Sequence, residues 1–185
     1  MRTLSETRPS NFFVSSWISS LRRLQSSSGR CLDVAGGSGR HARPLAAHGL
    51  DVTLSDVSPV GVEIAARETA EAGLELATLV YDVEEAGLPP GPWDVIVQVH
   101  FLHRPLFNDI REGLKPGGAV VYQTFTTAQL ELESGPKNAD HLLAPRELAQ
   151  VFSDWEILRY REYVENEGPG NPSRALAGII AKKPE

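Results

Sequence analysis

Short apolar stretches that alternate with helical ones constrain the fold of this chain more than any other feature. Their patterns predict strands at 30–35, 51–55, 75–81, 93–99, 119–125, 155–164 and 174–181. Helices are predicted at 40–48, 59–72, 105–114 and 145–152. Alternating strands and helices form a parallel sheet covered on both faces, whereas two strands joined only by a turn pair antiparallel. We therefore predict an α/β fold with a doubly wound, mostly parallel seven-stranded sheet and an antiparallel C-terminal hairpin.

The length of 185 residues predicts a single domain, because domains usually have roughly 100–200 residues. Residues 1–28 are expected to form an N-terminal helix and a linker, since apolar residues recur there at helical spacing. Residues 29–125 form the expected cofactor-binding core. Residues 126–185 are expected to form a lid-like polar loop without secondary structure of its own, a short helix and the closing hairpin.

Composition excludes several classes of protein. The chain has a net charge of -6, which argues against a nucleic-acid partner because such partners require clustered Lys and Arg. No apolar run approaches the roughly 20 residues that cross a bilayer, and the first residues lack the apolar segment of a secretion signal. The lone Cys31 cannot form an internal disulfide. We therefore expect a cytoplasmic protein without a membrane partner.

The loop after the first predicted strand, Asp33 to Gly39, is rich in glycine. In an open α/β sheet the ligand binds beyond the carboxyl ends of the strands, where the strand order reverses, so this loop is a candidate ligand site. Taken alone it is a weak signal. The segment from Gly37 to Ala42 even fits the dinucleotide-binding pattern G-x-G-x-x-G/A.

Asp33 separates the two candidate cofactors. A carboxylate at this position would repel the pyrophosphate of a dinucleotide by roughly 1–4 kcal/mol at a few Å. S-adenosylmethionine has no phosphate, and its sulfonium and ammonium groups would be attracted. The alternative is that Asp33 only accepts N–H bonds from the loop, and the two roles can coexist.

Two further acids end predicted strands. Asp56 follows the second strand, close to the offset at which a ribose-binding acid occurs, and its carboxylate can accept bonds from both ribose hydroxyls. Asp82 follows the third strand and can accept a bond from the exocyclic amine of adenine. Either residue alone could be a solvated strand end, but three acids in register favour a binding site.

These motifs resemble those of the class I S-adenosylmethionine-dependent methyltransferases over nearly the whole chain. The stretch 32–40 is similar to their first motif, Asp56 and Asp82 to their second and third, and 114–118 to the motif before their fifth strand. Within this superfamily, 39–43, 102–107 and 122–125 are most similar to small bacterial proteins grouped with the tellurite-resistance methyltransferases. The resemblance implies S-adenosyl-L-methionine as cofactor. The residues expected to bind it are Asp33, Ala35, Gly36, Gly37, Gly39, Arg40, Asp56, Val57, Asp82, Val83, Gln98 and Val99.

Three residues depart from the family pattern. Ala35 replaces the first glycine of the usual triplet, which is tolerable if its φ stays negative. Pro44 lies early in the helix after the loop, where it removes an N–H and is expected to loosen the first turn. Gln123 stands where the subgroup tends to have Glu, so no acidic role is assigned there.

The expected reaction is an in-line transfer of the methyl group to a small-molecule acceptor, with a protein side chain second and RNA third. The candidate catalytic residues are His100, His103 and Tyr122, and the polar stretch with Asn138, Asp140 and His141 is expected to close over the acceptor. Each has a structural alternative. His103 and Arg104 can cap the next helix or hold its loop, and Tyr122 can point into the core.

The histidines and two alternative functions complete the expectations. His41 and His48 are expected on a helix surface, and no histidine spacing predicts a metal site. An NAD(P)-dependent oxidoreductase is the competing enzyme class, opposed by Asp33. A non-catalytic protein that binds S-adenosylmethionine for regulation also stays open.

Overall fold

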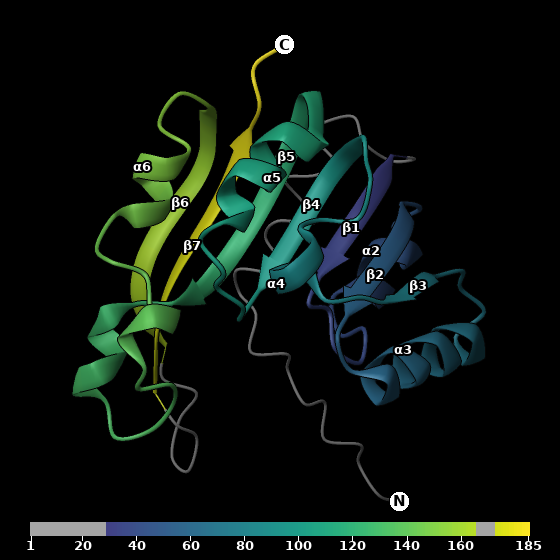
Figure 1. Ribbon diagram of the computed structural model, residues 1–185, viewed down its shortest axis with the longest axis horizontal. Helices are drawn as coiled ribbons and strands as arrows, with labels where there is room; N and C mark the ends of the chain where they lie inside the picture. Colours follow the sequence, from purple (N-terminus) through teal and green to yellow (C-terminus); the bar gives the residue numbers. More distant parts are fainter. Residues whose placement is uncertain (1–28, 166–172) are drawn as a thin grey trace, which may run out of the picture.

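The computed structural model describes residues 29–165 and 173–185 (Figure 1). The predicted N-terminal helix and the turn at 168–172 lie outside these residues. The strands are β1 (Arg30–Val34), β2 (Asp51–Asp56), β3 (Ala77–Val80), β4 (Trp93–Val99), β5 (Leu114–Phe125), β6 (Glu156–Glu165) and β7 (Arg174–Lys182). The α-helices are α2 (Ala42–Ala47), α3 (Pro59–Glu71), α4 (Val83–Ala86), α5 (Leu106–Gly113) and α6 (Glu147–Val151), and two 3₁₀ helices are η1 (Thr127–Glu131) and η2 (Ala139–His141).

Within the described residues, seven strands form one sheet in the order β3-β2-β1-β4-β5-β7-β6 (Figure 1). The pairs from β3 to β5 are parallel, and β7 pairs antiparallel with both β5 and β6. The predicted fold class, including the C-terminal hairpin, is therefore confirmed. The strand order reverses between β1 and β4, so the carboxyl ends of these two strands flank the crevice in which such sheets bind ligands.

Side-chain alternation along the strands builds one core on each face of the sheet. On one face, Leu32, Ile96 and Tyr122 pack with residues of α4, α5 and α6. On the other, Cys31 and Val97 pack with residues of α2 and α3. Because both faces carry helices, the central strands are almost continuously buried, as expected for a parallel sheet.

Most predicted elements are found within two residues of their expected ends. Ser58 caps α3 through a bond from the Gly61 N–H to its Oγ (3.1 Å), with Pro59 as the first helical residue. The first helix after the loop is shorter than predicted, because Arg40 and His41 still belong to the turn. Pro44 is the third residue of α2, where its missing N–H would have no helical partner, so the helix tolerates it.

The local structure differs from the predictions in two places. The stretch 126–144, predicted to be a lid-like loop without secondary structure, contains the helices η1 and η2, and hydrogen bonds join it to the sheet. The Ala175 N–H of β7 donates to Oε1 of buried Gln129 (2.7 Å), and the Leu143 N–H donates to the Phe125 carbonyl at the end of β5 (2.9 Å). The second is α4, which the sequence did not predict. No helix among the described residues is long and apolar enough to cross a membrane.

Candidate functional site

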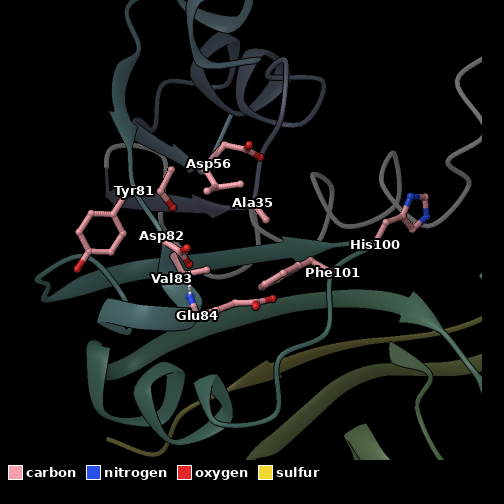
Figure 2. A pocket seen from close by; sticks show the side chains of 10 residues that line it. Ala35, Asp56, Tyr81, Asp82, Val83, Glu84, His100 and Phe101 are labelled. Carbon is pink, nitrogen blue, oxygen red and sulfur yellow. Dashed lines mark hydrogen bonds between the residues drawn. The ribbon is translucent and has the colours of Figure 1, made fainter. Parts of the chain in front are cut away.

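A cavity of about 410 Å³ opens at the carboxyl ends of β1, β2, β3 and β4 (Figure 2). It is lined by Ala35, Ser55, Asp56, Val57, Tyr81, Asp82, Val83, Glu84, His100 and Phe101. Figure 2 shows Asp56, Tyr81 and Asp82 gathered at one end, whereas His100 lies at the other end, beyond Ala35 and Phe101. The cavity therefore has an acidic end and an end without carboxylates.

The glycine-rich loop between β1 and α2 borders the cavity through its first residue, Ala35. The condition under which alanine would be tolerable there, a negative φ, is not met, because the φ of Ala35 is 51°. The chain must reverse direction immediately after β1, and the Gly36 N–H bonds to the Ser55 carbonyl (3.1 Å) beside it. Gly36 could not carry a side chain, because a Cβ would lie 2.8 Å from both Leu54 and the Asp33 carboxylate.

Asp56 fastens this loop to the next one. Its Oδ2 accepts a bond from the Gly37 N–H (2.8 Å), and its Oδ1 accepts one from the Ser58 N–H (2.8 Å). Each carboxylate oxygen can accept a second bond, so both remain able to bind hydroxyl groups in the cavity. Asp56 thus holds the walls of the cavity as well as facing it.

Asp82 has a similar double position. Its Oδ1 caps α4 by accepting bonds from the N–H groups of Glu84 (2.9 Å) and Glu85 (3.4 Å). The same short helix brings Glu84 to the cavity. With Asp56, Asp82 and Glu84 at one end, the cavity repels phosphate groups and attracts cationic or hydrogen-bond-donating ligands.

Asp33 lies beneath the loop and does not line the cavity. It is 1% exposed, and burial raises the pKa of its carboxyl group to about 7, partly opposed by the Ala42 N–H bond and the positive charge of Arg40. Asp33 thus accepts a backbone N–H bond, as the structural alternative predicted, but from the first residue of α2 rather than from the loop. Its Oδ2 is buried and has no hydrogen-bond partner in the structure. A buried carboxyl of this kind is poised to ionise when a cation binds nearby.

Of the residues expected to bind the cofactor, the cavity brings together five: Ala35, Asp56, Val57, Asp82 and Val83. The others support its walls instead. Gly36, Gly37 and Gly39 shape the loop, and Arg40 extends from it towards His100, with 3.5 Å between Arg40 Nη2 and His100 Nδ1. Gln98 and Val99 are buried in β4.

Sequence reasoning missed Ser55, Tyr81, Glu84 and Phe101 as lining residues. All four adjoin residues that it did select. Ser55, Tyr81 and Phe101 lie at the same strand ends as those neighbours, so their positions could have indicated them. Glu84 reaches the cavity through the unpredicted helix α4, so the strand ends did not indicate it.

Among the catalytic candidates, only His100 lines the cavity. Its ring packs against Phe125 with 5.1 Å between ring centres, and its Nε2 is enclosed without a partner. Burial, Arg40 and Arg174 together lower the pKa of His100 to about 4, so its ring is neutral at pH 7. Because a guanidinium can only donate, a bond between Arg40 and His100 would make Nδ1 the acceptor.

Tyr122 and His103 occupy other positions. Tyr122 is fully buried, and burial raises its pKa far above the usual range, so we do not retain it as a group that contacts substrate. His103 is half-buried outside the cavity, and its carbonyl accepts the Leu106 N–H at the start of α5 (3.1 Å). This bond uses the main chain, and no side chain of the described residues caps the start of α5, so the bond assigns no role to the His103 ring.

The polar stretch expected to close over the acceptor does not reach this cavity. Asn138 caps η2 by accepting the Asp140 N–H (3.0 Å), and both side chains are exposed. Arg104 donates to the carbonyls of Asp140 (2.8 Å) and Leu142 (2.9 Å) and to the carboxylate of Glu147 (2.7 and 2.9 Å). Arg104 therefore holds this segment against the start of α5.

Two further points concern histidines and metals. His41, expected on a helix surface, is 4% exposed because the turn before α2 folds it inward; His48 is half-buried. Burial, followed by Arg40 and His100, lowers the pKa of His41 to about 4. Across residues 29–165 and 173–185, no three His, Cys, Asp or Glu side chains gather as a metal site requires.

The chain has recognisable relatives among known proteins. Residues 31–118 match a family model described as a methyltransferase domain. The chain is 26% identical over 164 residues to the probable S-adenosyl-L-methionine-dependent methyltransferase TehB of Haemophilus influenzae, a match that covers 83% of this chain and 57% of TehB. It is 27% identical over 168 residues to hemagglutinin 1 of Eikenella corrodens, covering 84% of this chain and 55% of that protein.

A solved structure extends the comparison to the fold. The crystal structure of H. influenzae TehB matches with a TM-score of 0.76 and 22% identity, over 91% of this chain and 62% of that chain. The chain spans just over half the length of the two curated relatives. Together with the strand order and the glycine-rich loop, these matches support the resemblance of the chain to the class I S-adenosylmethionine-dependent methyltransferases, and to TehB among them.

Proposed function

We propose that the protein binds S-adenosyl-L-methionine in the 410 Å³ cavity and transfers its methyl group to a small-molecule acceptor. The observation that carries the proposal is the acidic end of the cavity, formed by Asp56, Asp82 and Glu84 beyond the carboxyl ends of β2 and β3, next to the switch point between β1 and β4. Asp56 would accept bonds from the ribose hydroxyls and Asp82 from the adenine amine. The methionine part would then lie along Ala35, towards His100.

The same charges oppose a dinucleotide. A pyrophosphate at the loop would lie close to Asp56, whose carboxylate bonds to Gly37 within the loop itself (2.8 Å). The cofactor proposed here carries a sulfonium and an ammonium group, which Asp33 and the carboxylates of the cavity attract. Arg40, beside His100, is suitably placed to pair with the carboxylate of the methionine part.

The transfer itself is an in-line displacement. A lone pair of the acceptor attacks the methyl carbon while the carbon–sulfur bond breaks, and its electron pair stays on sulfur, giving S-adenosylhomocysteine. Any proton on the acceptor atom leaves to solvent. Charge disperses in this transition state, so catalysis can rest on positioning and desolvation rather than on a strong base. The lowered pKa of His100, about 4, and its enclosed Nε2 fit a transfer that uses no strong base.

The proposal of a small-molecule acceptor rests on the net charge of -6, which disfavours RNA. We further propose that 29–125 form the cofactor-binding core and that the whole chain acts as one domain. The two alternatives, an oxidoreductase and a non-catalytic binder, make different predictions in the experiment that follows.

The test is calorimetric titration of the protein with S-adenosylmethionine, S-adenosylhomocysteine and NAD. Binding of both adenosyl ligands with no response to NAD is expected, and the reverse result would remove the methyltransferase proposal. Asp56→Asn should weaken binding at least tenfold, because charge-assisted bonds contribute roughly 1.5–3 kcal/mol each. Incubation with methyl-labelled cofactor and a low-molecular-mass cell extract then separates an enzyme from a regulator, which would bind the cofactor without releasing S-adenosylhomocysteine.

A further inference from the structure

The loop between β4 and α5 forms one wall of the cavity. Its first two residues, His100 and Phe101, line the cavity directly. His100 has a φ of 59°, a left-handed conformation that non-glycine residues adopt only when their surroundings impose it. Something in the structure must therefore hold this loop in place.

Two buried side chains converge on the carbonyl of Phe101. The Tyr122 hydroxyl donates to it (3.0 Å), and the Gln98 Nε2 donates to it as well (3.2 Å). Gln98 Nε2 also lies 2.5 Å from the Tyr122 hydroxyl oxygen, so the three groups form a closed set. The pairing of β4 with β5 sets Gln98 directly opposite Tyr122, and both side chains are fully buried.

Neither side chain lines the cavity, but both donate to the carbonyl of Phe101, which does line it. The two lone pairs of the Phe101 carbonyl are matched by two donors, which leaves this carbonyl one orientation. Burial also keeps the Tyr122 hydroxyl protonated by raising its pKa far above the usual range, so it stays a donor at all relevant pH values. The other end of the loop is held separately, by Arg104 and Glu147.

We propose that Gln98 and Tyr122 are positioning residues that hold the Phe101 carbonyl and thereby give the cavity wall the shape that the cofactor requires. The proposal rests on the proposed function, since it concerns the affinity of the same site. It assigns to both residues a role different from those expected at first, which were cofactor contact for Gln98 and catalysis for Tyr122.

The test uses Tyr122→Phe, which removes one hydroxyl and keeps the ring in the core. The matched control is Thr69→Val in α3, which also removes a buried hydroxyl that donates to a carbonyl, that of Ala65 (2.6 Å). S-adenosylhomocysteine is the probe, and calorimetry gives its dissociation constant. We expect Tyr122→Phe to weaken binding five- to tenfold while Thr69→Val changes it less than twofold, with similar losses of melting temperature.

A second measurement needs no ligand. Hydrogen exchange of the peptide covering 100–106 should become at least tenfold faster in Tyr122→Phe and stay unchanged in Thr69→Val. Gln98→Met, which removes the amide but keeps the volume, should act in the same direction. It replaces Tyr122→Phe if that variant does not fold.

The outcomes separate the two proposals. If the wild type does not bind S-adenosylhomocysteine, the proposed function fails, and selective loosening of 100–106 still supports the positioning role. If the wild type binds but Tyr122→Phe or Gln98→Met has the same affinity and the same exchange as Thr69→Val, the positioning role is overturned.

Discussion

Replacing Asp33 by Asn tests the physical reasoning about the cofactor loop most directly. The Asp33 side chain is 1% exposed, and burial raises the pKa of its carboxyl group to about 7. Asn has the same shape and keeps a carbonyl oxygen for the Ala42 N–H, but it cannot ionise. Asp33→Asn therefore removes a buried charge with little change in packing.

The effect on stability follows from the two pKa values of Asp33. The unfolded carboxyl group ionises near 3.8 and the folded one near 7, so the unfolded chain loses its proton first. The wild-type free energy of unfolding therefore falls as pH rises from about 4 to about 7 and is constant above that. Each pH unit in this window costs about 1.4 kcal/mol, roughly 4 kcal/mol in total. Without ligand at about pH 8, Asp33→Asn should be more stable than the wild type by an amount of this order.

Cofactor binding should respond in the opposite direction. Only the ionised carboxylate attracts the sulfonium and ammonium groups, so the apparent affinity rises as Asp33 loses its proton. For a pKa of about 7, affinity should increase about 15-fold between about pH 5.5 and pH 7.0. The amino group of the cofactor stays mostly protonated there, because α-amino groups ionise near about 7.7–8.0. In Asp33→Asn the pH dependence should disappear.

Urea unfolding of the ligand-free protein and calorimetric titration of S-adenosylmethionine at several pH values measure these two effects. Asp51→Asn is the control, since it makes the same substitution at an exposed position of β2. The reasoning about a buried, ionisable Asp33 is refuted if Asp33→Asn and the wild type are equally stable at about pH 8 and keep the same pH dependence of binding.

Three further predictions concern the same end of the sheet. Ala35→Gly should raise the free energy of unfolding by about 0.5 kcal/mol, because relief of the left-handed φ of 51° outweighs the greater flexibility of the unfolded chain; a lower melting temperature would contradict this. Arg104→Met should lower the free energy of unfolding by about 1–2 kcal/mol and speed proteolysis of 138–147, and equal cleavage rates in variant and wild type would count against the anchoring role. Burial lowers the pKa of His41 and His100 to about 4, below their unfolded value of 6.5, so the stability that they contribute is lost as pH falls from about 6.5 to about 4. His41→Gln should therefore reduce the loss of stability over that pH range, as measured by urea unfolding. An unchanged pH profile would show that His41 is not buried in its neutral form.

Local sequence determined the elements of this fold and their order. Periodicity and capping signals act over a few residues, so β4 lies at its predicted bounds and α3 begins at Pro59 as predicted. The hairpin of β6 and β7 was predictable because no helix separates the two strands. The shared location of Asp56 and Asp82 at the cavity was also predictable, since parallel strands bring their carboxyl ends to one edge of the sheet.

Tertiary structure decided how those residues are used, because burial and partners depend on contacts between segments far apart in the chain. Asp33 became a buried carboxyl with a raised pKa only once α2 and the loop covered it. Gln98 and Tyr122 are separated by 24 positions, and their shared contact with Phe101 exists only through the register of β4 and β5. A sequence shows which groups can ionise or donate, whereas only the packed structure shows which of them are withdrawn from water and what they then hold in place.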